Sequence, residues 1–194
     1  MPNLGAFLSY IIITTFTPGP NNILSMSNAA KYGFKRNISF SMGIFSGAIV
    51  IMVLCSAFSS TIFNLLPSIK PIMTYVGAAY ILWLSWKIYK SKPHDEGEDC
   101  GRENNFVSGF LLQFVNPKVI IYGITIFATF ILPYYESSVS IGLFAVGLAF
   151  IGFVSVNCWA LFGSGFNNFL KRYYKVVNSA MALMLVYCAV SLFY

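Results

Sequence analysis

The sequence predicts an all-α integral membrane protein with six transmembrane helices, arranged as two inverted three-helix repeats. Composition is the first observation, because 57% of the 194 residues are apolar and only 9% are charged, against roughly 25% charged in ordinary soluble domains. The second is the distribution of charge. Asp, Glu, Lys, Arg and His are all absent from residues 1–30, 37–69, 71–86, 119–135, 137–170 and 176–194. A spanning helix needs about 20 mostly apolar residues, so several of these runs are long enough to cross a bilayer.

The six expected helices cover residues 4–27, 38–60, 70–89, 106–131, 139–162 and 175–193. Basic residues follow the first, third and fifth of them: Lys31, Lys35, Arg36; Lys87, Lys90, Lys92, Arg102; and Lys171, Arg172, Lys175. The opposite side has only Lys70, and Lys118 falls inside a helix. The positive-inside rule therefore predicts cytoplasmic basic loops and periplasmic termini. This pattern also accounts for the net charge of +6, so no nucleic-acid partner is expected.

One polar stretch, residues 91–105, holds five of the six acidic residues. We interpret it as a cytoplasmic linker within a single transmembrane domain, 1–194, that joins repeat one (1–90) to repeat two (106–194). Because each repeat has an odd number of helices, the second repeat enters the membrane from the opposite side and is inverted relative to the first. Inverted repeats of this kind are common in secondary transporters.

Proline-rich motifs interrupt the first helix of each repeat. The first repeat has Thr17-Pro18-Gly19-Pro20-Asn21-Asn22, and the second has Asn116-Pro117-Lys118. Proline removes a backbone donor and clashes with the preceding turn, and the freed carbonyls must find partners inside the protein or in a water-filled cavity. Either motif alone would also fit a kink without function. Their matching positions favour a binding site between the repeats.

The chemistry of the two motifs suits an amino acid. A half-helix that starts at Pro20 directs free N–H groups and its positive dipole end toward an anion such as a carboxylate. Lys118 is the one charge deep in an apolar segment, which points to function; alternatively, Lys118 snorkels or bonds the carbonyls freed at the first motif. The candidate substrate-binding residues are Pro18, Gly19, Pro20, Asn21, Asn22, Asn116, Pro117, Lys118 and Asn157.

Other classes of function lack the residues they need. A membrane protease or lipid transferase requires a nucleophile with a base, or a metal cluster, and the expected helices contain no His, Asp or Glu and no HExxH or GxSxG motif. We therefore predict no enzyme activity, no metal site and no cofactor. Gly43 and Gly47 form a GxxxG pair that would serve either a contact within the chain or a homodimer.

The motifs resemble those of the LysE/RhtB family of bacterial amino-acid exporters. The resemblance covers essentially the whole chain and rests on residues 17–22, on Gly77-Ala78-Ala79-Tyr80-Ile81 and on Gln113-Phe114-Val115-Asn116-Pro117-Lys118. Residues 157–161 and 185–190 resemble the branch that exports cysteine and O-acetylserine. The resemblance implies a bacterial inner-membrane secondary exporter of small neutral amino acids that works by alternating access and is driven by protons. The alternatives are export of homoserine, threonine or lysine, or a passive channel.

One position departs from the family pattern. Many members have Asp directly after the Pro-Gly-Pro turn, whereas this chain has Asn21. Proton coupling through a carboxylate within the membrane is therefore unsupported. Coupling would run through Lys118, a tyrosine or the substrate, or would be absent. The substrate ammonium also lacks an anionic partner, so carbonyl oxygens or an aromatic face would have to receive it.

Overall fold

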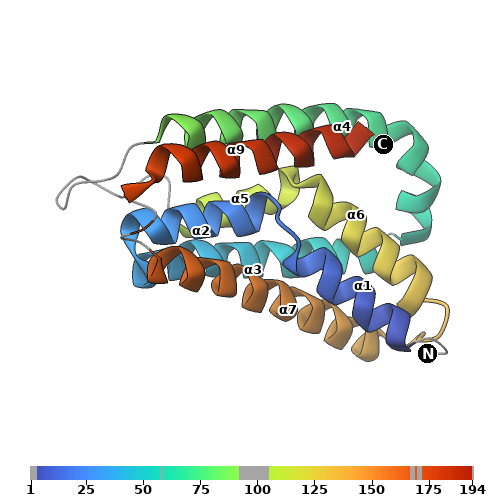
Figure 1. The fold of residues 1–194 in the computed structure, drawn as a ribbon. Helices are drawn as coiled ribbons and strands as arrows, with labels where there is room; N and C mark the ends of the chain where they lie inside the picture. Colours follow the sequence, from blue (N-terminus) through green and yellow to red (C-terminus); the bar gives the residue numbers. More distant parts are fainter. Residues whose placement is uncertain (1–3, 58, 92–104, 167–168, 170–171, 194) are drawn as a thin grey trace.

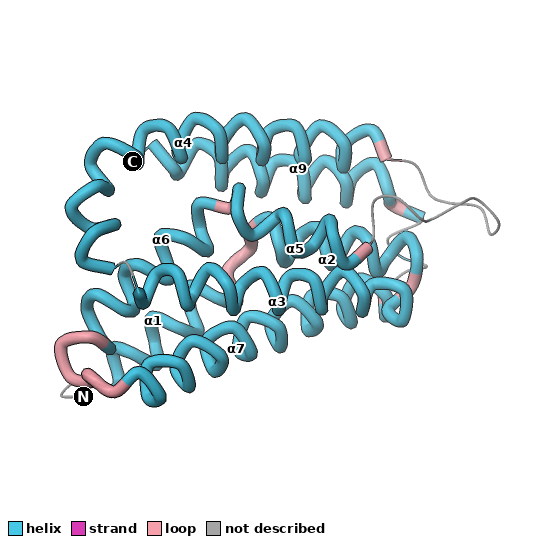
Figure 2. Tube along the Cα trace, turned by 180° about the vertical axis from the view of Figure 1, so that it is seen from behind, coloured by secondary structure: helices cyan, strands magenta, loops and turns pink. Residues whose placement is uncertain are grey.

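The computed structural model describes residues 4–57, 59–91, 105–166, 169 and 172–193, and every regular element among them is a helix (Figures 1 and 2). The polar linker expected over 91–105 lies almost wholly outside the described residues. The helices are α1 (Leu4–Phe16), α2 (Pro20–Tyr32), α3 (Phe34–Ala57), α4 (Ser59–Lys90), α5 (Phe106–Val115), α6 (Pro117–Ile126), the π-helix η1 (Phe127–Ile131), α7 (Ser138–Gly165), α9 (Tyr174–Val190) and the 3-10 helix η2 (Ser191–Phe193).

Several described helices have the length and apolarity to cross a membrane. Within the described part of the chain these are Phe34–Ala57, Ser138–Gly165 and Tyr174–Phe193. The helices Phe106–Val115 and Pro117–Ile131 qualify together, with a bend of 64° between them. The chain is therefore a multi-pass helical membrane protein, in agreement with the prediction from composition.

The segment over residues 4–27, expected as a helix interrupted at its proline-rich motif, consists of α1 and α2, which are separated by Thr17, Pro18 and Gly19. Gly19 is extended, with φ −164° and ψ 174°, and Pro20 occupies the first turn of α2, where its missing N–H costs no helical hydrogen bond. At the second motif, Asn116 has β-region dihedrals (φ −91°, ψ 99°) and Pro117 begins α6. Proline disfavours the α conformation in the residue before it, which explains why α5 ends there.

The segment after α3 differs from the prediction. A connection over residues 61–69 and a helix over 70–89 were expected, but the backbone is helical from Ser59 to Lys90. Pro67 and Pro71 lie within this helix, and its first turns point in a different direction from the remainder (Figure 1). Proline often kinks a helix without ending it, and the sequence does not distinguish these outcomes.

The helices form layers in which α4 and α9 lie side by side, on the far side of α2, α5 and α6 from α3 and α7 (Figures 1 and 2). Two bonds tie the α4–α9 pair together: Ser85 Oγ donates to the Ala182 carbonyl at 3.0 Å, and Asn178 Nδ2 donates to the Ser91 carbonyl at 2.7 Å. One apolar core connects this pair to the other layers, and it includes Ile23, Ile44, Ala78, Ile81, Leu84, Leu112, Val156, Met181 and Leu185.

Glycines allow α3 and α5 to pack backbone against backbone. A Cβ added at Gly43 would lie 2.0 Å from the Phe106 carbonyl oxygen, and one at Gly47 would lie 2.7 Å from the Phe110 carbonyl oxygen. The contact is reciprocal, because a Cβ at Gly109 would lie 2.2 Å from the Phe40 carbonyl oxygen. The GxxxG pair therefore serves a contact within the chain, and α5 covers this glycine face.

Candidate functional site

Four consecutive carbonyls, those of the last two residues of α1 and the first two of the interruption, each accept a hydrogen bond from a side chain. Thr15 O accepts from Asn22 Nδ2 (2.9 Å) and Ser155 Oγ (3.0 Å). Thr17 O accepts from Asn22 Nδ2 (3.1 Å) and Lys118 Nζ (2.9 Å). The intervening Phe16 O accepts from Trp159 Nε1 at 3.3 Å, and Pro18 O accepts from Cys188 Sγ at 3.5 Å. The donors come from α2, α6, α7 and α9, so the interruption is satisfied entirely inside the protein, as an apolar solvent requires.

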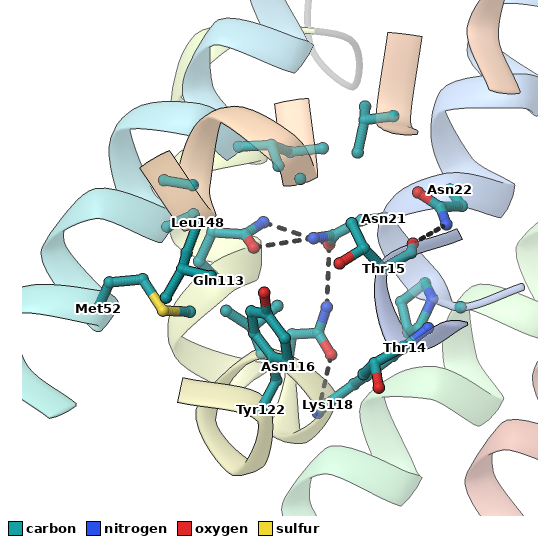
Figure 3. A pocket seen from close by; sticks show the side chains of 18 residues that line it. Thr14, Thr15, Asn21, Asn22, Met52, Gln113, Asn116, Lys118, Tyr122 and Leu148 are labelled. Atoms are coloured by element: carbon teal, nitrogen blue, oxygen red, sulfur yellow. Dashed lines mark hydrogen bonds between the residues drawn. The ribbon is translucent and has the colours of Figure 1, made fainter. Parts of the chain in front are cut away.

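Three amide side chains join the two interruptions. Asn21 Nδ2 donates to Gln113 Oε1 at 2.9 Å, while Asn21 Oδ1 accepts from Gln113 Nε2 at 3.2 Å and from Asn116 Nδ2 at 2.9 Å (Figure 3). Asn116 Oδ1 in turn accepts from the Lys118 backbone N–H at 3.2 Å and caps α6. Gln113 and Asn116 are buried, so this network fixes the start of α2 against the junction of α5 and α6.

Lys118 crosses from the second interruption to the first. Besides the bond from Nζ to Thr17 O, its side chain runs along Gly19, where an added Cβ would lie 3.0 Å from Nζ. Lys118 was expected either to bind substrate or to bond a carbonyl freed at the first motif, and the structure contains the second of these contacts. That bond uses one of the three ammonium hydrogens, and Lys118 also lines a cavity, so the amine can still meet a bound anion.

The cavity lies between the interruptions and has a volume of about 70 Å³. A water molecule needs roughly 10–15 Å³ by this measure, so there is room for several waters or for part of a small solute. Polar side chains from both interruptions form one side of the wall, and apolar residues of α3 and α7 form the other. The lining residues are Thr14, Thr15, Gly19, Pro20, Asn21, Asn22, Ile44, Ala48, Met52, Gln113, Asn116, Lys118, Val119, Tyr122, Leu148, Ala149, Gly152 and Val156.

Six of the nine candidate residues line this cavity: Gly19, Pro20, Asn21, Asn22, Asn116 and Lys118. Pro18 and Pro117 shape the interruptions without lining it. Asn157 is also outside the lining, and its Nδ2 donates to the Phe153 carbonyl of its own helix at 2.8 Å. Gln113 also lines the cavity; it was expected only as part of a family motif, although an amide in an otherwise apolar run is a usable signal for a site residue. Thr15 and Tyr122 gave no such signal, since single hydroxyl residues are common in membrane helices.

The amide network gives a direct test of what holds the site together. Asn21→Ala removes three hydrogen bonds and leaves Gln113 and Asn116 without these partners. Each buried polar group left unpaired costs about 1–3 kcal/mol, so we expect a clear fall in the thermal unfolding temperature of the purified protein. Asn157→Ala removes only a bond within one helix turn, and it is the matched control. Equal unfolding temperatures for the two variants would mean that the hydrogen bonds of Asn21 do not stabilise the contact between α2 and the junction of α5 and α6.

Comparisons with known proteins place the chain in a family. Residues 12–194 match the family described as LysE type translocator. The cysteine/O-acetylserine efflux proteins of Escherichia coli strain K12 and of Shigella flexneri are both 40% identical to this chain over 191 residues, which cover 98% of the chain and 97% of each relative. No solved structure matches the chain significantly.

These findings confirm the family that the sequence motifs indicated. They also identify the chain as a transporter and not an enzyme, in agreement with the sequence analysis. The match extends through both interrupted helices and the cavity between them. This chain belongs to the LysE family of translocators.

Proposed function

We propose that this protein is a secondary exporter of small neutral amino acids in the bacterial inner membrane, with cysteine and O-acetylserine as substrates. The observation that carries the proposal is the cavity between two interrupted helices, whose wall offers Lys118 and the first turn of α2 together. A cation and free helical N–H groups are the expected receptors for a carboxylate. The printed names of the relatives from Escherichia coli and Shigella flexneri support the choice of cysteine and O-acetylserine.

The proposed mechanism is alternating access around this cavity. Six spans would be α1 with α2, α3, α4, α5 with α6 and η1, α7, and α9, divided into inverted repeats 1–90 and 106–194. The two interrupted spans then occupy equivalent places in the two repeats, which is the usual position of a substrate site in such transporters. Gly19 to Asn22, Asn116 and Lys118 would contact the substrate, while Pro18 and Pro117 would hold the interruptions open.

The proposal is tested by measuring uptake of amino acids into inside-out membrane vesicles that contain the protein, or into lipid vesicles reconstituted with the purified protein. We expect saturable uptake of labelled O-acetylserine, inhibition by unlabelled cysteine, and faster uptake when a proton gradient is imposed. Uptake that is saturable but indifferent to the gradient would overturn only the proton coupling. A flux that rises linearly with concentration and shows no competition would instead identify a passive channel. No uptake of either amino acid by folded protein would contradict the substrate assignment.

The proposed orientation places both termini in the periplasm and the three basic loops in the cytoplasm. A reporter enzyme that is active only in the periplasm, fused after Tyr194, is expected to be active. The same reporter fused after Lys90 is expected to be inactive, because that position follows the third span. The reverse pattern would contradict the orientation.

A further inference from the structure

The oxygens of the amide network are largely committed to one another. Asn21 Oδ1 accepts two hydrogen bonds, Gln113 Oε1 accepts one from Asn21, and Asn116 Oδ1 accepts one from the backbone of α6. A carbonyl oxygen has two lone pairs, so Asn21 Oδ1 has none left. The network can fasten helices together, but it offers few acceptors to a substrate ammonium group.

Two hydroxyl groups in the cavity wall have no such commitment. Thr15 Oγ1 and Tyr122 Oη are buried and lie close enough to interact with each other, but neither makes a hydrogen bond of normal geometry to any described residue. Tyr122 is only 8% exposed. Both hydroxyls point into the cavity, from α1 and α6 respectively (Figure 3). Leaving a buried polar group unpaired destabilises the protein, and here that cost would be recovered when a solute fills the cavity.

The charges of the wall show which part of a substrate these hydroxyls suit. Lys118 is the one cation that lines the cavity, and no Asp or Glu is among the lining residues. A zwitterionic amino acid brings a carboxylate, which matches the hydrogens left on Lys118 Nζ, and an ammonium, which needs acceptor oxygens. Hydroxyl groups accept as well as donate, so Thr15 and Tyr122 supply these acceptors.

We propose that the hydroxyls of Thr15 and Tyr122 form the subsite that receives the α-ammonium group of the exported amino acid. This assignment rests on the function proposed above. It also predicts a preference for neutral amino acids, because a substrate with a second positive charge would find no anion in the wall to balance it against Lys118. Neutral acceptors hold an ammonium more weakly than a carboxylate does, which favours release on the far side of the membrane.

A pair of isomeric solutes isolates the ammonium group. O-Acetylserine and N-acetylserine contain the same atoms, but the second carries its acetyl group on nitrogen and has no ammonium. Mildly acidic buffer prevents acetyl migration from oxygen to nitrogen during the assay. KM for uptake into inside-out vesicles is measured for the first solute, and the inhibition constant is measured for the second, with wild type, Thr15→Val and Tyr122→Phe. Tyr10→Phe is the matched control, because Tyr10 stacks on Tyr122, with ring centroids 5.9 Å apart, but does not line the cavity.

We expect each of the two variants to raise KM for O-acetylserine about tenfold, because each removes one hydrogen bond to a charged group. The inhibition constant of N-acetylserine should stay within about twofold of wild type, and Tyr10→Phe should change neither constant. An unchanged KM in both variants, or an equal loss for both solutes, would overturn the subsite while leaving export intact. If one variant does not reach the membrane, the other decides by the same criterion. Wild-type protein that moves no O-acetylserine would remove both the proposed function and this subsite.

Discussion

Lys118→Ala is expected to reduce export to background while the protein still reaches the membrane. The substitution removes the bond from Nζ to Thr17 O at 2.9 Å and the only cation that lines the cavity. Loss of one hydrogen bond to a charged group costs about 1.5–3 kcal/mol, and loss of the proposed carboxylate partner adds a comparable penalty to substrate binding. Together these effects should lower kcat/KM by at least about a hundredfold, measured as initial uptake into inside-out vesicles.

A second variant separates the charge of Lys118 from its bulk, and a third, at another lysine, is the control. Lys118→Met keeps most of the apolar stem beside Gly19 without the amine, and it should be as inactive as Lys118→Ala. Lys35→Ala removes a lysine that is exposed outside the cavity and should transport normally. Undiminished export by Lys118→Ala, at equal protein levels, would exclude Lys118 from the transport site.

Gly43→Ala is expected to destabilise the protein more than any other single added methyl group in the described helices. The new Cβ would lie 2.0 Å from the Phe106 carbonyl oxygen, and that oxygen belongs to a backbone that cannot rotate away as a side chain can. The helices α3 and α5 must therefore separate, which opens the packing around Gly47 and Gly109 as well. Overpacking of this kind typically costs about 1–3 kcal/mol, and it should appear as a lower thermal unfolding temperature in detergent.

Gly147→Ala is the control for this prediction, because an added Cβ at Gly147 of α7 meets no described atom within 4 Å. Alanine is favoured over glycine in a helix by about 1 kcal/mol, so Gly147→Ala should be neutral or slightly stabilising. An unfolding temperature for Gly43→Ala equal to that of Gly147→Ala would mean that α3 and α5 do not pack as described.

The positions of the two interruptions could be predicted because they depend on local chemistry. Pro18, Pro20 and Pro117 lack backbone donors, and α2 and α6 each begin at one of these prolines. Asn21, Asn22 and Asn116 were singled out because amides next to a break in an apolar segment need a reason to be there, and all three line the cavity.

The remaining features depend on tertiary packing, which one sequence does not encode locally. Pro67 and Pro71 resemble the other prolines in sequence, yet the helix continues through both. Asn157 was chosen only as an amide within an apolar segment, and it bonds to its own helix. Tyr122, in contrast, was not among the expected site residues. Its hydroxyl lines the cavity beside Thr15 only because α1 and α6 pack together there. Periodicity gave little help, because lipid-facing and core-facing residues are both apolar.

The end of α1 has one more consequence, for the way in which mutations combine. The carbonyls of residues 15–18 are held by α2, α6, α7 and α9, and one of these bonds joins residues 170 positions apart in the chain. If the end of α1 moves during transport, it must leave these partners together, because the carbonyls are adjacent on one backbone. Replacements at Ser155, Trp159 and Cys188 should therefore be epistatic: once one has freed the segment, a second should cost less than it does alone. The divergence of this chain from its relatives would then leave correlated changes on α7 and α9, two helices that barely touch one another.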